Sequence, residues 1–130
     1  MGCPDCGGET LAFQVPGEFR PLLPGEESGV ALCTRCLALH PDPDPPAELP
    51  NLQDASDAFP TDPGAAIPMA LAVGLLESLA LYRSEISELL AAVERAGSDP
   101  LLVLDRLARD PDLEPGVDLA GRRRQVEQLL

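Results

Sequence analysis

The stretch CPDCG at residues 3–7 returns in related form as CTRCL at residues 33–37, and these two stretches hold all four cysteines of the 130-residue chain. Two thiolates in a C-x-x-C pair can bind one metal ion when the backbone between them forms a tight turn, here called a knuckle. Two knuckles supply four sulfur ligands, which is a set that a structural Zn²⁺ ion prefers. The sequence therefore predicts one zinc site with the ligands Cys3, Cys6, Cys33 and Cys36.

Iron is the alternative metal for such a site. Iron proteins of the rubredoxin type also use two C-x-x-C-G knuckles separated by a long stretch. Gly7 follows the first knuckle here and can take the positive φ that such a turn often needs, but Leu37 stands at the same place in the second. Aromatic residues make up only 3% of the chain, whereas rubredoxin cores are rich in them. Four thiolates leave no open coordination position, so we expect the site to be structural rather than catalytic.

Paired cysteines also occur as disulfide bonds and as redox centres. Disulfides form in oxidising compartments, and the chain starts Met1-Gly2-Cys3 with no stretch resembling a secretory signal. A redox C-x-x-C lies where a strand meets a helix in a βαβ unit, and the surroundings rich in Pro and Gly do not offer one. We therefore expect a metal site in a cytoplasmic protein.

Between the knuckles the sequence predicts a short antiparallel hairpin. Residues 10–15 alternate apolar and other side chains, which is the pattern of a strand, and residues 30–32 return toward the second knuckle. A hairpin joining two knuckles makes residues 1–40 a zinc ribbon. This segment has few apolar side chains, so we expect it to need its metal in order to fold. His40 follows closely, but with four cysteines present we expect it not to be a ligand.

Helical periodicity replaces the strand pattern from residue 65 onward. Residues 67–76 are apolar on every side, which predicts burial all round. Six residues step by four and three positions, as in a heptad seam: Leu75, Leu79, Tyr82, Ile86, Leu89 and Val93. This spacing predicts one long helix over residues 65–96 with its seam in the core. The seam could also pair with a second copy of the chain, which would give a homodimer.

Two shorter helices are expected after a stop at Gly97. Ser98 or Asp99 can cap the first of them, and Pro100 suits its first turn. Asp118 could cap the second, which would run to the end of the sequence. No membrane span is expected, because the apolar run is too short for one.

Residues 41–64 are dense in Pro and Asp, which is typical of an extended and fairly stiff linker. Phe59, a large aromatic residue within it, is expected to pack onto the helices. The predicted fold class is therefore α+β, with a zinc ribbon over 1–40, a linker over 41–64 and a small helical domain over 65–130.

The charge of the chain is strongly negative. It has 22 acidic residues against nine basic ones, all of them arginine, and a formal net charge of −13. Such a charge normally argues against nucleic-acid binding. An acidic chain without lysine is, however, the signature of extreme halophiles, in whose molar salt the Debye length is about 3 Å. In that case the negative charge reflects adaptation to a salty solvent and does not exclude nucleic acid as a partner. Nucleic acid therefore remains an alternative partner, and Arg122–Arg124 is the basic cluster that could contact it.

Four stretches carry a resemblance to a known family: CPDCG at 3–7, CTRC at 33–36, DAFPTDP at 57–63 and ERAGSDPLLVLDRL at 94–107. The chain resembles a family of short, uncharacterised haloarchaeal proteins with an N-terminal C-P-x-C-G zinc finger, over nearly its whole length. The resemblance implies a zinc ribbon with the four cysteines as ligands. It supplies no mechanism, because that family has no established activity.

No catalytic motif accompanies the cysteines: the chain has no G-x-S-x-G, no Gly-rich phosphate loop and no H-E-x-x-H. We therefore predict a non-enzymatic zinc-binding adaptor whose helices contact a protein partner that the sequence does not identify. One alternative is a nucleic-acid-associated factor, since zinc ribbons commonly serve transcription and translation. The other is a rubredoxin-like electron carrier with iron.

Overall fold

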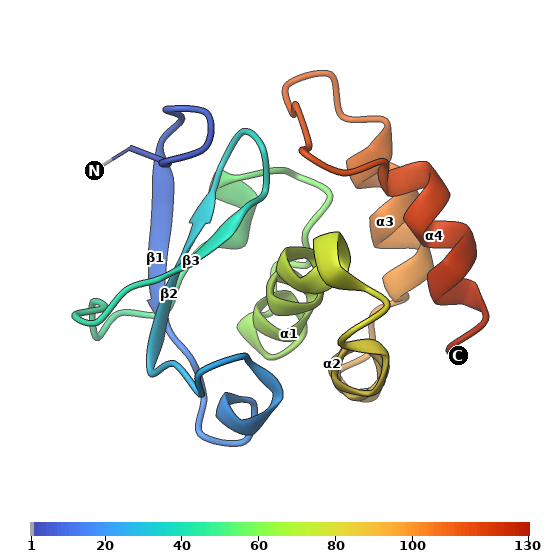
Figure 1. Ribbon diagram of the computed structural model, residues 1–130, viewed down its shortest axis with the longest axis horizontal. Helices are drawn as coiled ribbons and strands as arrows, with labels where there is room; N and C mark the ends of the chain where they lie inside the picture. The colour runs from blue at the N-terminus through green and yellow to red at the C-terminus, as the bar shows by residue number, and fades with distance from the viewer. Residues whose placement is uncertain (1) are drawn as a thin grey trace.

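The computed structural model describes residues 2–130 as a small antiparallel sheet with helices packed beside it (Figure 1). In this part of the chain the strands are β1 (Thr10–Gln14), β2 (Gly29–Cys33) and β3 (Leu39–Pro41), in the order β1-β2-β3. The helices are α1 (Pro63–Leu75), α2 (Arg83–Arg95), α3 (Pro100–Ala108) and α4 (Leu119–Glu127). Short 3-10 turns are η1 (Arg20–Leu22), η2 (Leu52–Asp54) and η3 (Leu76–Ser78). The α+β class is as predicted.

The predicted hairpin is present as β1 and β2. The two strands pair antiparallel with Leu11 opposite Leu32 and Phe13 opposite Val30, and Phe13 and Leu32 are both completely buried. The third strand, β3, was not predicted. It pairs antiparallel with β2 directly after the second knuckle, and its three residues, which end in a proline, are too few to show a period-2 pattern.

The long helix predicted over residues 65–96 is wrong. α1 ends at Leu75, the single turn η3 follows, and α2 begins only at Arg83. A straight helix over 65–96 would be about 48 Å long, and much of it would extend beyond so small a core. The break instead lets α2 fold back along α1 (Figure 1), so that both helices bury their apolar residues in one cluster.

The break also removes the basis of the predicted homodimer. Three residues of the seam, Ile86, Leu89 and Val93, are each 0% exposed within the chain itself. That face is occupied by the chain's own core and does not offer a surface to a second copy. α1 is buried on nearly every side, as predicted, with ten of its 13 residues buried.

A single cluster of buried side chains joins the sheet to all four helices. Leu52 and Phe59, both 1% exposed, carry residues 41–64 into this cluster. Phe59 therefore packs in the core, as expected. Within the same stretch the buried Ser56 donates a hydrogen bond to Asp110 across 2.6 Å. The division at residues 40 and 64 stays a prediction about which parts fold independently.

α3 and α4 form a helical hairpin on the side of α2 away from the sheet (Figure 1). Asp99 caps α3, and its carboxylate accepts hydrogen bonds from the amides of Leu101 and Leu102. Asp118 caps α4 in the same way through the amide of Gly121. Among residues 2–130, no helix combines the length and apolar character needed to span a bilayer.

Candidate metal centre

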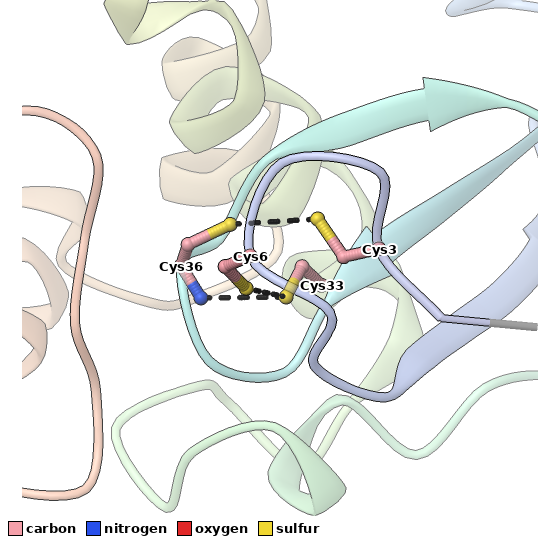
Figure 2. A group of neighbouring side chains, drawn as sticks. All are labelled: Cys3, Cys6, Cys33 and Cys36. Atoms are coloured by element: carbon pink, nitrogen blue, oxygen red, sulfur yellow. Dashed lines mark hydrogen bonds between the residues drawn. The ribbon is translucent and has the colours of Figure 1, made fainter.

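The four cysteines come together where the two knuckles meet at one end of the sheet (Figure 2). Cys3 Sγ lies 3.7 Å from Cys36 Sγ, and Cys6 Sγ lies 3.5 Å from Cys33 Sγ. All four sulfurs lie within 4.8 Å of one another. A tetrahedral ion with bonds of about 2.3 Å to sulfur sets its ligand atoms about 3.8 Å apart. The cluster therefore fits one tetrahedral metal ion, held by the four residues that the sequence singled out.

The two knuckles repeat the same backbone hydrogen bonds. In each knuckle, the amide of the first cysteine donates to the carbonyl of the residue five positions later in the chain. The amide of the residue four positions later donates back to the carbonyl of the first cysteine. These distances are 2.7 and 2.8 Å over residues 3–8, and 2.9 and 3.1 Å over residues 33–38. The repeat presents two pairs of sulfurs to each other, which the spacing of the cysteines alone could only suggest.

Amide groups also point at the sulfurs. The amides of Asp5, Gly8 and Arg35 each donate to the sulfur two residues earlier, at 3.4 Å. Hydrogen bonds to a thiolate favour the charged form. The knuckle backbone therefore offsets part of the negative charge that four thiolates bring together.

Leu37 explains how the second knuckle does without glycine. Its φ is 63°, close to the 76° of Gly7 at the same place in the first knuckle. For a residue with a side chain this left-handed backbone costs about 1–2 kcal/mol. Leu37 is, however, 4% exposed and belongs to the core cluster, and burying such a side chain contributes about 1.5–3 kcal/mol. Burial therefore offsets the strain.

Gly8 has a steric role at the site that sequence reasoning missed. A Cβ at this position would lie 3.1 Å from Cys33 Sγ and 3.3 Å from Cys6 Sγ. Glycine therefore lets the first knuckle pass close against the sulfurs of both knuckles. The adjacent Gly-Gly in the sequence gave no indication of which glycine would face the metal ligands.

The acidities of the thiols differ across the cluster. Burial raises the pKa of Cys33, but hydrogen bonds from the amides of Cys36 and Arg35 outweigh it, and the pKa falls from 9.0 to about 7. Burial also acts to raise the pKa of Cys3, but backbone hydrogen bonds outweigh this effect, and the pKa is lowered. Burial raises the pKa of Cys36 to about 12, helped by its contacts with the other thiols. Between pH 7 and pH 12, the metal-free cluster therefore holds the Cys33 thiolate beside the protonated Cys36 thiol.

His40, on β3, lies beside the cluster. Its Nε2 is 3.8 Å from Cys3 Sγ and 3.3 Å from Asp5 Oδ2. The histidine therefore sits against one of the four sulfurs, with a carboxylate on its other side. The strand β3 places it there, and that strand was missing from the sequence-based expectation.

The loop between α3 and α4 packs on the second knuckle. The amide of Glu114 donates to the carbonyl of Arg35 at 2.8 Å, and the amide of Gly116 donates to the carbonyl of Cys36 at 3.3 Å. A cavity of about 350 Å³ lies between this loop, the knuckles and α1. These bonds join backbone to backbone, so no side-chain pattern could have predicted them.

The basic cluster on α4 is largely engaged within the chain. Arg123 pairs with Asp105 of α3 at 2.6 Å and with Glu127 at 2.9 Å. Arg122 donates to the side-chain oxygen of Gln125 at 3.0 Å. Arg123 therefore joins α3 to α4, which leaves it poorly placed to contact a phosphate backbone.

Two cysteine knuckles at the end of a small sheet, packed against helices, define an α+β protein with a four-cysteine cluster that could hold a metal ion. The chain belongs to DUF6276, a family of unknown function, whose sequence pattern matches residues 2–130. Searches among curated proteins and among solved structures found no match.

Proposed function

We propose that this protein is a non-enzymatic zinc-binding adaptor of a halophile, in which a structural Zn²⁺ ion fixes a surface for another protein. The observation that supports the proposal is that the sulfurs of Cys3, Cys6, Cys33 and Cys36 all lie within 4.8 Å of one another, with two pairs at 3.7 and 3.5 Å. Four thiolates leave no open position for a substrate. A site of this composition supports a structural role.

The proposed partner-binding surface, here called the adaptor surface, consists of the second knuckle and the loop between α3 and α4. Arg35 and Glu114 are both exposed and lie side by side through their backbone hydrogen bond. An ion bound to Cys33 and Cys36 would hold this knuckle rigid, and with it the docked loop. The two segments are far apart in the sequence, so a partner that contacts both would recognise only the metal-loaded fold.

Zinc is favoured over iron by the amino-acid composition of the chain. Rubredoxin-like proteins surround iron with aromatic side chains, and this chain is 3% aromatic. Elemental analysis and absorbance of the purified protein test the choice. A colourless protein containing one zinc per chain supports the proposal, and a red protein containing iron contradicts it in favour of an electron carrier.

The halophilic origin rests on the absence of lysine and on the net charge of −13. Molar salt screens charges beyond a few ångströms, so such a chain can stay folded despite its charge. We expect the protein to unfold or lose structure when KCl is lowered from molar to millimolar concentration, as followed by circular dichroism.

The adaptor role is tested by affinity capture from a halophilic lysate in molar KCl. Native protein should retain a distinct partner, and Arg35→Glu, which reverses the charge at the exposed tip of the second knuckle, should lose it. Arg83→Glu is the matched control, because Arg83 is also exposed but stands at the start of α2. Equal capture by all three proteins would contradict the proposed surface.

Nucleic-acid association has less support, since Arg123 is taken up by Asp105 and Glu127. Binding to ribosomal RNA or plasmid DNA in molar KCl, compared between the native chain and an Arg122→Gln/Arg124→Gln variant, distinguishes the two functions. Binding by the native chain that the variant loses would replace the adaptor with a nucleic-acid factor.

A further inference from the structure

A second group of metal-ligating side chains adjoins the four-cysteine cluster and shares one residue with it. Within the described residues, ligand atoms of Cys3, Asp5 and His40 lie within 4.8 Å of one another. We propose that this group binds a second divalent ion of the zinc class, with the thiolate of Cys3 bridging the two ions. The inference goes beyond the adaptor function, although it rests on the four-cysteine site being filled by its own ion.

The distances suit a single small ion. His40 Nε2 lies 3.3 Å from Asp5 Oδ2 and 3.8 Å from Cys3 Sγ. With the usual zinc bond lengths, the edges of a tetrahedron are about 3.3 Å between nitrogen and oxygen and about 3.5 Å between nitrogen and sulfur. The third edge, between the Asp5 carboxylate and Cys3 Sγ, is at most 4.8 Å, so one ion can contact all three ligand atoms once the exposed Asp5 side chain moves inward by about 1 Å or less.

The ligands come from two rigid elements. Cys3 and Asp5 belong to the first knuckle, where the amide of Asp5 is hydrogen-bonded to Cys3 Sγ at 3.4 Å. His40 belongs to β3 and faces them from the sheet, opposite Ala31 of β2. Because the knuckle and the strand are each fixed by backbone hydrogen bonds, the three side chains need little rearrangement to bind an ion.

Electrostatics favour a second cation at this place. One dication among four thiolates and the Asp5 carboxylate leaves three net negative charges on the centre, and a second dication reduces this to one. In the described part of the chain no arginine forms a salt bridge with Asp5, so a cation from solution can neutralise charge that the protein's own side chains leave there. A thiolate that already binds one ion keeps lone pairs with which to bind another.

The second ion would be the more exchangeable of the two. The side chains of His40 and Asp5 are 29% and 62% exposed, whereas Cys3 is 4% exposed. Three protein ligands leave one position of a tetrahedral ion open. Water or a donor atom from a partner could fill that position. Asp5 lines the cavity beside the loop between α3 and α4, so the second ion adds a point of contact, next to the adaptor surface, that responds to metal supply.

The experiment loads full-length, metal-free, reduced protein with Zn²⁺ in molar KCl and counts the bound ions by elemental analysis after gel filtration. We expect two ions on the native chain and one on His40→Ala and on Asp5→Asn. Asp57→Asn is the matched control, because Asp57 is an exposed acid outside the cluster, and it should keep two ions.

Substituting ¹¹³Cd²⁺ provides a second measurement that does not depend on counting alone. We expect two resonances coupled through the shared sulfur in the native chain and one uncoupled resonance in His40→Ala. One resonance and one ion on the native chain would overturn the second site and leave the four-cysteine site standing. Two ions on His40→Ala would place the second ion elsewhere and also overturn it. Failure to bind any ion would instead refute the proposed function.

Discussion

At the scale of single residues, Gly7 and Gly8 are neighbours with different roles. Gly7 has a φ of 76° and nothing within 4 Å of where a Cβ would stand. Gly8 instead faces the sulfurs of Cys6 and Cys33. A methyl group at the first position therefore strains only the backbone, while a methyl group at the second presses on the metal ligands.

We expect Gly8→Ala to weaken metal binding by about tenfold or more, the scale seen when contacts around metal ligands are disturbed. Gly7→Ala should leave metal affinity nearly unchanged and lower the free energy of unfolding by about 1 kcal/mol, because of its left-handed backbone. Competition with a chelator measures the affinity, and denaturant titration measures the stability. If both variants bound metal equally well, the close contact at Gly8 would not matter to the site.

The pH dependence of metal binding follows from the thiols. Each cysteine must lose its proton to bind the ion, so affinity falls as the pH falls. The pKa of Cys33 is lowered from 9.0 to about 7, so the metal-free folded chain carries this thiolate above pH 7 and loses it below. The stability that this lowered pKa gives the metal-free fold is fully present above the unfolded value and is lost as the pH falls through 7.

We therefore expect about one more proton to be released on metal binding near pH 6 than near pH 8. Cys36, whose pKa is raised to about 12, keeps its proton at both values and contributes equally to each. Calorimetric titrations in buffers with different ionisation enthalpies count the protons. The same number at both pH values would mean that Cys33 does not titrate as its surroundings indicate.

At the scale of elements, the starts of α3 and α4 were predictable, whereas the break between α1 and α2 and the end of α4 at Glu127 were not. Asp99 before Pro100, and Asp118 before α4, are capping signals that act through the neighbouring backbone alone. The break has no proline or glycine between residues 75 and 83 to mark it. Just before the break, Gly74 in the last turn of α1 packs so closely on β3 that a Cβ there would overlap Leu39, and such a contact between distant segments leaves no periodic signal in the sequence.

Capping by Asp99 leads to a prediction for α3. Asp99→Ala should lower the free energy of unfolding by about 1 kcal/mol, because two amides lose their acceptor. Asp99→Asn should restore most of it, because in molar salt the interaction of the charge with the helix dipole is screened and the hydrogen bonds remain. Thermal unfolding in molar KCl is the measurement. An asparagine variant as unstable as the alanine variant would show that charge, not hydrogen bonding, stabilises this end.

At the scale of the whole molecule, the meeting of the four cysteines could be predicted and their connection to the rest of the fold could not. Two C-x-x-C pairs indicate a common site through their chemistry, so the cluster could be predicted without a fold. Phe59 alone gave a hint that residues 41–64 join the core, in which Leu52 is also buried. The docking of Glu114 and Gly116 on the second knuckle uses backbone N–H and C=O groups. Every residue has the C=O and every residue except proline has the N–H, so the sequence carried no sign of this docking.

The packing of the knuckles, the sheet and the helices into one core determines how metal removal affects the stability of the protein. Suppose that the buried cluster from Phe13 to Val126 unfolds as one cooperative unit. A free ion concentration a thousand times the Kd then adds about 4 kcal/mol to the free energy of unfolding of the whole chain. We then expect metal removal to lower the Tm of the helices as well as that of the sheet. Far-ultraviolet circular dichroism and calorimetry should show one transition, moved to lower temperature.

Cys3→Ser/Cys36→Ser provides the same comparison without a chelator, since it removes one ligand from each knuckle. Its helical signal should melt at the lower temperature of the metal-free native chain. A helical signal that melts at the same temperature with and without metal would mean that residues 65–130 fold independently of the knuckles. In that case the ion would organise only the sheet end, and a partner that depends on the metal would have to bind there, away from the helices.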